Sequence, residues 1–225
     1  RWTPLEVRLA AELPGELAAE ATALAARLGL AAPRERADRL HELCKSREHQ
    51  GLIARMPAYP YLDPAALWPA LPANPCLLVL DAIQDAFNFG AILRCAEVFG
   101  ADAVIVGTTG QCEVTSQVVR SSAGAVHHVP IVQAESLTAC LQELATRGVR
   151  LVAASEKGAQ PPFATDFRGP TAVVIGNEGR GIAPALLALC AATVAIPQQG
   201  RVGSLNAAVA AGVLLYEVSR QRVGG

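Results

Sequence analysis

The sequence lacks the residue patterns from which metal sites, disulfide frameworks and membrane spans are built. Its six cysteines stand singly, without a CxxC pair, and no histidine lies beside them at ligand spacing. We therefore expect free, buried thiols and no bound metal. No apolar run reaches the roughly 18 residues that a membrane span needs, and no basic-then-apolar signal segment opens the chain. A soluble, cytoplasmic protein is the expectation.

Charge and lysine are also scarce. Charged residues make up 17% of the chain and the net charge is -1, so the bulk charge gives no attraction for nucleic acid. Only Lys45 and Lys157 are lysines among the 19 basic residues, and the others are arginine, which suits bidentate phosphate contacts. A GC-rich coding bias, with which the many alanines, glycines and prolines agree, explains the arginines equally well.

Apolar residues, in contrast, are abundant. The hydrophobic fraction is 52% over 225 residues, which argues against disorder and suffices for one large domain or a core domain with a smaller attachment. Residues 1 to about 56 predict the smaller unit, with strands at 4–10 and 51–56 and helices at 15–30 and 36–44.

A proline-rich stretch follows this small unit. Six of the fifteen prolines fall between Pro57 and Pro75. Proline at that density removes hydrogen-bond donors and stops helices, so we interpret the stretch as a linker. We predict a small domain with its linker at residues 1–65 and a second domain at residues 66–225.

From Cys76 onward, apolar strand patterns alternate with helical ones, which is typical of a mainly parallel sheet with helices on both faces. The predicted strands are 76–81, 103–107, 128–132, 150–155, 171–176 and 193–197. The predicted helices are 90–100, 113–122, 135–148, 183–190 and a last one that opens at 204–206. Ligands of such folds lie beyond the carboxyl ends of the strands. This rule selects three loops: Asp81 to Gly90, Gly176 to Gly181, and Pro197 to Gly203.

The first loop ends in Asn88, just before a predicted helix that carries Arg94 on its first turns. One interpretation is structural: Asn88 caps the helix and Arg94 pairs with an acid. The other is functional, because an amide and a guanidinium at one helix mouth suit a ribose hydroxyl and a neighbouring phosphate.

The other two loops are rich in glycine. In the second, Gly176, Gly179 and Gly181 surround Glu178 and Arg180, with neither GxGxxG nor Walker A spacing, so a tight turn and a binding site are both open. The third loop joins a short strand to a helix that Ser204 is expected to cap. A strand, a glycine-rich loop and a helix N-terminus collect backbone N–H groups that can hold a polar small molecule.

Together the segments NFGAILRCA, VIGNEGRGI and IPQQGRVGSLNAAVAAGVLLYE resemble the three motifs of the SpoU (TrmH) family of RNA ribose 2′-O-methyltransferases, in the SPOUT superfamily. The resemblance covers residues 76 to 221. In front of it, RADRLHELCKSREHQGLIARM resembles the end of a small RNA-binding domain in the branch that modifies large-subunit ribosomal RNA. On this comparison the small domain is incomplete at its N-terminus.

This resemblance implies an α/β fold in which a mainly parallel sheet with helices on both faces ends in a C-terminal trefoil knot. It implies S-adenosylmethionine as cofactor, an RNA substrate, and a homodimer formed through the SPOUT domain. The reaction implied is methyl transfer to a ribose 2′-OH, in the first place of a guanosine in 23S rRNA. A tRNA substrate, a non-catalytic RNA-binding factor in ribosome assembly, and an unrelated nucleotide-binding α/β enzyme remain alternatives.

The resemblance also implies roles for individual residues. The catalytic set is Arg94, Asn88, Glu178, Ser204 and Asn206. The cofactor-binding set is Gly176, Asn177, Glu178, Ile196, Gln198, Gly200, Ser204, Leu205 and Asn206. The RNA-binding set is Arg94, Arg120, Arg180, Arg201, His49 and Gln50. The chain departs from the family pattern at Gln198, where methionine is usual, and at Ala208, where serine is frequent. The family proposal makes Arg94 the base, but a guanidinium seldom accepts a proton, so it can equally clamp an RNA phosphate.

Overall fold

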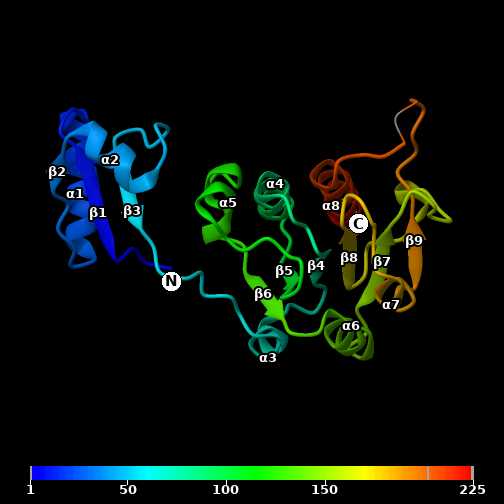
Figure 1. Ribbon diagram of the computed structural model, residues 1–225. Helices are drawn as coiled ribbons and strands as arrows, with labels where there is room; N and C mark the ends of the chain where they lie inside the picture. Colours follow the sequence, from blue (N-terminus) through cyan, green and yellow to red (C-terminus); the bar gives the residue numbers. More distant parts are fainter. Residues whose placement is uncertain (1, 202, 224–225) are drawn as a thin grey trace. The chain divides into compact units, whose positions relative to one another are not determined.

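The linker is shorter than its prolines predict. The computed structural model describes residues 2–201 and 203–223, and they form two compact units, the first ending at Pro60 and the second beginning at Tyr61 (Figure 1). Residues 61–65, assigned to the linker from the sequence, belong to the second unit because Leu62 joins its sheet. The Leu62 N–H donates to the carbonyl of Ile131, and the Leu62 carbonyl accepts from the N–H of Gln133, both at 2.9 Å.

The small unit is built around a three-stranded sheet. Its strand order is β2-β1-β3, with β1 parallel to β2 and antiparallel to β3. Leu9 of β1 is fully buried against an alanine face of the first helix, Ala18 and Ala25. Of its elements, only the two-residue strand β2 was not predicted. They are β1 (Glu6–Ala10), α1 (Gly15–Arg27), β2 (Arg34–Glu35), α2 (Ala37–Cys44) and β3 (Leu52–Arg55).

The second unit contains a six-stranded, entirely parallel sheet of order β6-β5-β4-β8-β7-β9. The strands are β4 (Cys76–Asp81), β5 (Ala103–Gly107), β6 (Ile131–Ala134), β7 (Arg150–Ala154), β8 (Thr171–Gly176) and β9 (Ala192–Val194). The helices are α3 (Pro64–Leu67), α4 (Ala86–Val98), α5 (Ser116–Ser121), α6 (Leu137–Thr146), α7 (Pro184–Leu187) and α8 (Ala207–Val223). The predicted α/β fold class is confirmed. The knot stays a prediction, and Val202, which falls in the third loop, lies outside the described residues.

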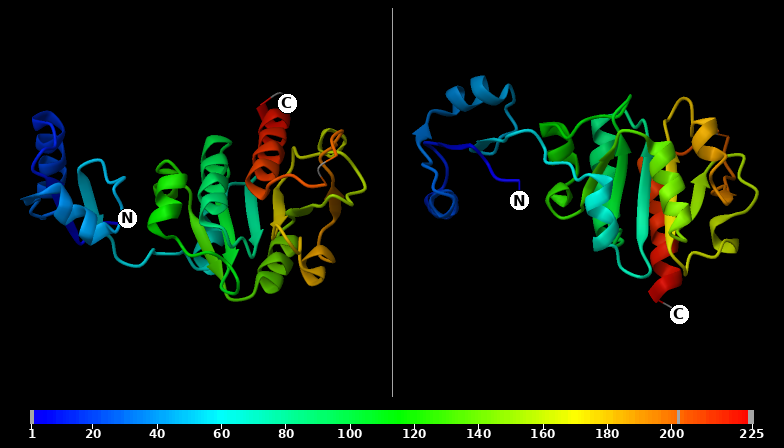
Figure 2. Two further views of the ribbon diagram at one scale, coloured as in Figure 1. Left: turned by 45° about the horizontal axis from the view of Figure 1, so that its top comes forward. Right: turned by 90° about the horizontal axis from the view of Figure 1, so that it is seen from below.

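Helices cover both faces of this sheet. Figures 1 and 2 show α4, α5 and α8 on one face and α3, α6 and α7 on the other. On the second face, Val79 and Ile105 of the sheet pack with Leu141 and Leu144 of α6. Strand β4 is buried on both sides from Cys76 to Leu80, which explains why the sheet strands are continuous apolar runs rather than alternating ones.

Two helix starts differ from the prediction. Helix α4 begins at Ala86 because the Asp85 carboxylate accepts a hydrogen bond from the Asn88 N–H, at 2.8 Å. Asn88 therefore lies inside the helix and does not cap it, and Arg94 lies beyond the first turns. Helix α8 is capped by Asn206, whose side-chain oxygen accepts from the Ala208 and Val209 N–H groups at 2.9 and 3.3 Å. Ser204, the predicted cap, precedes it.

Glycines of the motifs allow helices to approach closely. A Cβ atom on Gly90 would lie 1.9 Å from the Ser121 hydroxyl oxygen of α5 and 2.7 Å from the Val118 carbonyl oxygen. A Cβ atom on Gly212 of α8 would lie 3.2 Å from the Cys95 sulfur of α4. Gly90 is thus required by the packing of α4 on α5, whatever it does in the site.

The outer strands of the sheet are both covered by other segments of the chain. Leu62 pairs with β6, as described above. Ala159 and Gln160 pair with β9: the Ala159 N–H donates to the Thr193 carbonyl at 3.1 Å, and the Ala195 N–H donates to the Gln160 carbonyl at 2.9 Å.

All six cysteines are free, but they are not all buried as predicted. Cys76 and Cys140 are buried, Cys44 is exposed, and Cys95, Cys112 and Cys190 are partly buried. Burial disfavours a thiolate, and it raises the pKa of Cys76 and of Cys140 to about 11. Within the described residues, no helix combines the length and the apolar character required to cross a membrane, and no cluster of three potential metal ligands is found.

Candidate active site

The candidate site lies where the order of the strands reverses. From β4 the chain builds outward through β5 and β6, and it then crosses to the other half of the sheet, where β8 returns to lie beside β4. The strands β4 and β8 are in register, with Asp81 opposite Gly176 at their carboxyl ends. Parallel sheets bind ligands in the crevice outside such a switch point.

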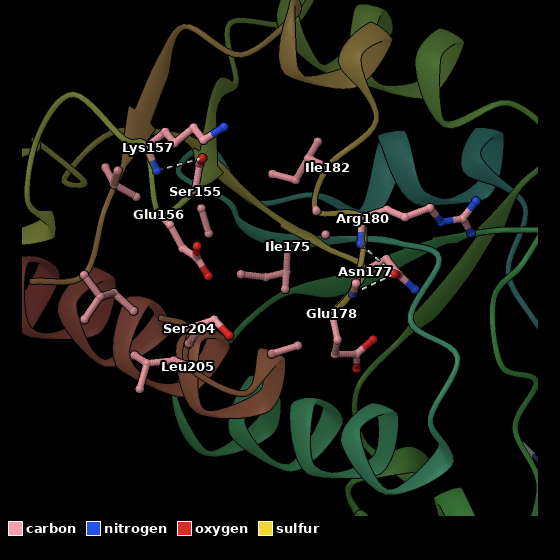
Figure 3. A pocket seen from close by; sticks show the side chains of 18 of the residues that line it. Ser155, Glu156, Lys157, Ile175, Asn177, Glu178, Arg180, Ile182, Ser204 and Leu205 are labelled. Carbon is pink, nitrogen blue, oxygen red and sulfur yellow. Dashed lines mark hydrogen bonds between the residues drawn. The ribbon is translucent and has the colours of Figure 1, made fainter. Parts of the chain in front are cut away.

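A cavity of about 450 Å³ opens beside these strand ends, within the size range of cofactor pockets. Figure 3 shows its lining, in which apolar side chains such as Ile175 and Leu205 alternate with charged ones. The lining comes from the segments after β7, β8 and β9 and from the start of α8. Its residues are Ala154, Ser155, Glu156, Lys157, Ile175, Gly176, Asn177, Glu178, Gly179, Arg180, Gly181, Ile182, Leu187, Val194, Ile196, Gln198, Ser204, Leu205, Ala207 and Ala210.

Side chains from all three segments of the family resemblance meet in one hydrogen-bonded chain beside this cavity. The Asn206 amide Nδ2 donates to Asn88 Oδ1 at 2.8 Å, and the Asn88 amide Nδ2 donates to Glu178 Oε1 at 2.7 Å. These residues are far apart in sequence and come from α4, from the loop after β8, and from the start of α8. The structure therefore brings the three motifs to a single place.

The direction of this chain follows from the N-terminus of α8. Because Asn206 Oδ1 accepts from two backbone N–H groups of that helix, its Nδ2 must face Asn88. Asn88 must then accept with its oxygen and donate with its nitrogen. The next group in the hydrogen-bonded chain must therefore be an acceptor, and the carboxylate of Glu178 is one.

The second loop is held in a tight turn by Asn177. Its Oδ1 accepts from the Gly179 and Arg180 N–H groups at 2.9 and 3.1 Å, and its Nδ2 donates to the Ala82 carbonyl at 2.8 Å. A Cβ on Gly176 would lie 2.3 Å from the Gly181 carbonyl carbon. The tight-turn interpretation of this loop is confirmed, and the turn places Glu178 in the lining of the cavity, so the binding-site interpretation stays a prediction.

Most of the predicted cofactor residues line the cavity. They are Gly176, Asn177, Glu178, Ile196, Gln198, Ser204 and Leu205. Gly200 and Asn206 do not line it, although Asn206 is connected to Glu178 through Asn88. Asn177 contributes by shaping the loop, since both ends of its amide are used by the backbone.

Only one of the predicted RNA-binding arginines lines the cavity. Arg180 lines the cavity, and its guanidinium extends away from Glu156 and Ser204 (Figure 3). Arg94, Arg120 and Arg201 are exposed and do not line it. Arg120 donates to Gln117 Oε1 at 2.7 Å.

In the small unit, Gln50 is exposed, but His49 is engaged internally. One ring nitrogen of His49 accepts from the Gly51 N–H at 2.9 Å, and the other lies 2.6 Å from His41 Nδ1. His49 thus stabilises the turn that presents Gln50.

Sequence reasoning missed one wall of the cavity, which Ser155, Glu156 and Lys157 form after β7. The segment carries no glycine pair or family motif that would draw attention to it. The signal that could have found it is its position, because it follows the carboxyl end of a buried parallel strand.

The fold and the site define an α/β protein with a cofactor-sized pocket at the switch point of a parallel sheet. Residues 75–216 match the SpoU rRNA Methylase family, which is more than half of the chain. The chain therefore belongs to the SpoU rRNA Methylase family.

Individual relatives agree with this assignment. An uncharacterized tRNA/rRNA methyltransferase of Mycobacterium avium is 39% identical over 178 residues, 78% of this chain and 58% of that protein. The 23S rRNA (guanosine-2′-O-)-methyltransferase RlmB of Ralstonia nicotianae is 37% identical over 82% of this chain and 75% of its own length. The crystal structure of the SpoU methyltransferase AviRb from Streptomyces viridochromogenes, in complex with AdoMet, matches with a TM-score of 0.84 and 28% identity over 100% of this chain and 85% of that chain. The chain thus spans only about three fifths of the Mycobacterium avium relative.

Proposed function

We propose that the protein is an S-adenosylmethionine-dependent RNA methyltransferase that transfers a methyl group to a ribose 2′-OH, of a guanosine in 23S rRNA. The observation that carries the proposal is the hydrogen-bonded chain Asn206–Asn88–Glu178 beside the cavity. It joins the three segments on which the family resemblance rests. The relative RlmB of Ralstonia nicotianae is a 23S rRNA (guanosine-2′-O-)-methyltransferase, which supports the choice of substrate.

The residues present fit the cofactor. S-Adenosylmethionine combines an apolar base with a charged amino acid and a positively charged sulfur. The cavity offers apolar side chains, Ile175, Ile196 and Leu205, beside the carboxylate of Glu178. Gly176 lets the backbone of Gly181 and Ile182 pack directly against it, which shapes the loop beside the cavity. AviRb, a structural relative, was crystallised with AdoMet. The departure from methionine at Gln198 still leaves that residue in the lining.

The cofactor, when bound, supplies an electrophilic methyl group. The protein has to orient the substrate ribose and stabilise the negative charge that develops on its 2′ oxygen as the proton leaves. We assign Glu178, Asn88 and Asn206 to positioning at the reactive end. Ser204 lines the same cavity, and we assign it to contact with the ribose hydroxyl of the substrate. Arg94 clamps an RNA phosphate and lowers the free energy of the developing alkoxide by electrostatic attraction.

Exposed arginines supply a local basic rim in spite of the neutral overall charge. Arg94, Arg180 and Arg201 make no ion pair with any carboxylate in the described parts of the chain. Arg120 joins them as an exposed side chain, bonded only to a neutral amide. Binding of RNA through such a rim weakens as salt is added.

The proposed activity is tested by calorimetry and by mapping. We expect the protein to bind S-adenosylmethionine with one site per chain. RNA from cells that lack the protein should lose one 2′-O-methylguanosine of 23S rRNA, and the purified protein should restore it. Loss of a tRNA methyl group instead would establish the alternative substrate. Failure to bind the cofactor would favour a non-catalytic assembly factor, and a preference for a dinucleotide would favour an unrelated enzyme.

We also propose that the protein is a homodimer through α8. Val209, Val213 and Tyr216 follow the spacing of one helical face, and they are 51%, 39% and 54% exposed. Exposed apolar side chains in one stripe mark an interaction surface. The Val213→Asp variant should therefore be monomeric in analytical ultracentrifugation, whereas Ala145→Asp, an exposed change on α6 of the opposite sheet face, should leave the dimer intact. A wild-type protein that sediments as a monomer at micromolar concentration would contradict the proposal.

A further inference from the structure

The wall of the cavity formed by residues 155–158 is a rigid turn. The Ser155 N–H donates to the Val194 carbonyl and the Gly158 N–H to the Ser155 carbonyl, both at 2.9 Å. The Lys157 N–H donates to the Ser155 hydroxyl at 3.2 Å. A Cβ on Gly158 would lie 2.3 Å from the carbonyl carbon of Val194, so the turn lies directly against β9. The side chain of Glu156 therefore starts from a fixed position.

Glu156 lines the cavity on the side opposite Glu178. Figure 3 shows its carboxylate directed into the space between Lys157 and Ser204, whereas Glu178 lies at the other side with Arg180. Glu178 is already bonded to Asn88. Glu156 has no hydrogen-bond or ion-pair partner among the described residues, so both of its oxygens are available as acceptors.

A carboxylate with two available oxygens can accept hydrogen bonds from a ligand that presents two neighbouring donors. An adenosine cofactor offers two kinds: the neighbouring 2′ and 3′ hydroxyls of its ribose, and the ammonium of its amino acid. Lys157 follows Glu156 in the same turn, so the pair carries no net charge and a neutral ligand group suits it. Two neighbouring hydroxyls can each donate to one oxygen of the Glu156 carboxylate.

We infer that Glu156 binds the 2′ and 3′ hydroxyls of the cofactor ribose and makes the pocket selective for a complete ribose. The inference rests on the proposed function, because it requires an adenosine cofactor in this cavity. It assigns Glu156 to cofactor recognition, on the side of the pocket opposite Glu178. The ribose of the RNA substrate is a separate group and is not part of this contact.

Binding of cofactor analogues tests the inference without measuring turnover. The probes are S-adenosylhomocysteine and its 2′,3′-dideoxy analogue, titrated calorimetrically into the wild-type protein and Glu156→Ala. We expect Glu156→Ala to weaken S-adenosylhomocysteine binding about 10- to 100-fold, the range expected for one or two hydrogen bonds to a charged group. The dideoxy analogue should bind both proteins equally and more weakly than S-adenosylhomocysteine binds the wild type.

Lys157→Ala is the matched control, because it changes the neighbouring residue of the same turn. It should leave the ratio of the two affinities unchanged. An equal loss of affinity for both ligands in Glu156→Ala would overturn the inference. A third ligand, 5′-methylthioadenosine, lacks the amino acid but keeps both hydroxyls. If Glu156→Ala weakens only S-adenosylhomocysteine and binds 5′-methylthioadenosine as the wild type does, the inference is also overturned. A wild-type protein that binds none of the three ligands would overturn the proposed function itself. Since Glu156 is exposed, unchanged thermal unfolding of the variants confirms that each is folded.

Discussion

Replacing Arg94 by alanine is expected to abolish methyl transfer while leaving cofactor affinity within a few-fold of the wild type. Arg94 is exposed on α4 and does not line the cavity, so its removal takes nothing from the cofactor pocket. What is lost is a positive charge for the RNA phosphate and the developing alkoxide. Removal of one such electrostatic group costs about 100- to 1,000-fold in kcat in other enzymes, and loss of RNA positioning adds to this. Single-turnover methylation and calorimetry measure the two effects separately.

The matched control for Arg94→Ala is Arg147→Ala. Arg147 is an exposed arginine on the opposite face of the sheet, where it donates to Glu143 Oε1 at 2.7 Å. Its removal should leave methylation unchanged. A tenfold or larger loss of cofactor affinity in Arg94→Ala would refute the separation of roles, because Arg94 would then have to support the pocket.

Gly176→Ala is expected to abolish cofactor binding, with a loss of affinity of at least about 100-fold, which corresponds to roughly 3 kcal/mol. The new methyl group would lie 2.3 Å from the Gly181 carbonyl carbon and 2.4 Å from the Ile182 nitrogen. Backbone atoms cannot rotate away as a side chain can, so the second loop must shift. The shift would displace Glu178 from Asn88. Calorimetry with S-adenosylmethionine measures the outcome.

The control for this change lies in the same loop. A Cβ on Gly179 would meet only Asn177 Oδ1, at 3.5 Å, which is ordinary van der Waals contact. Gly179→Ala should therefore bind the cofactor with nearly wild-type affinity. If both variants bind it equally well, the close approach at Gly176 does not govern the pocket. A similar loss in both would instead indicate that the loop needs its glycines for flexibility.

Much of the second unit could be predicted from the sequence because its strands are strongly apolar and its helices separate them regularly. The rule that ligands lie at the carboxyl ends of parallel strands then selected the three loops. The structure agrees in bringing Asn88 within hydrogen-bond distance of both Glu178 and Asn206. Their roles in catalysis remain predictions, since they come from the family resemblance.

The errors have identifiable physical causes. Asn88 and Ser204 were predicted as caps because both residue types favour that position, but Asp85 and Asn206 provide the caps. Propensity cannot choose between several suitable residues within one turn, whereas the packing of the helix can. The linker boundary was misplaced because proline density does not reveal that Leu62 pairs with a strand that is distant in sequence.

Glu156 was missed for a related reason. Nothing in the local sequence around a single glutamate distinguishes a solvated turn from the wall of a pocket. The distinction depends on the contact of Gly158 with the backbone of Val194, which is a long-range contact that folding alone creates.

The covering of both outer strands limits how this protein can meet others. An uncovered strand presents a row of unpaired amide and carbonyl groups, onto which another polypeptide can add by sheet extension. Here Leu62 occupies that position along β6, and Ala159 with Gln160 occupies it along β9. Addition of another strand at either edge would have to displace these segments, so sheet extension is hindered at both sides.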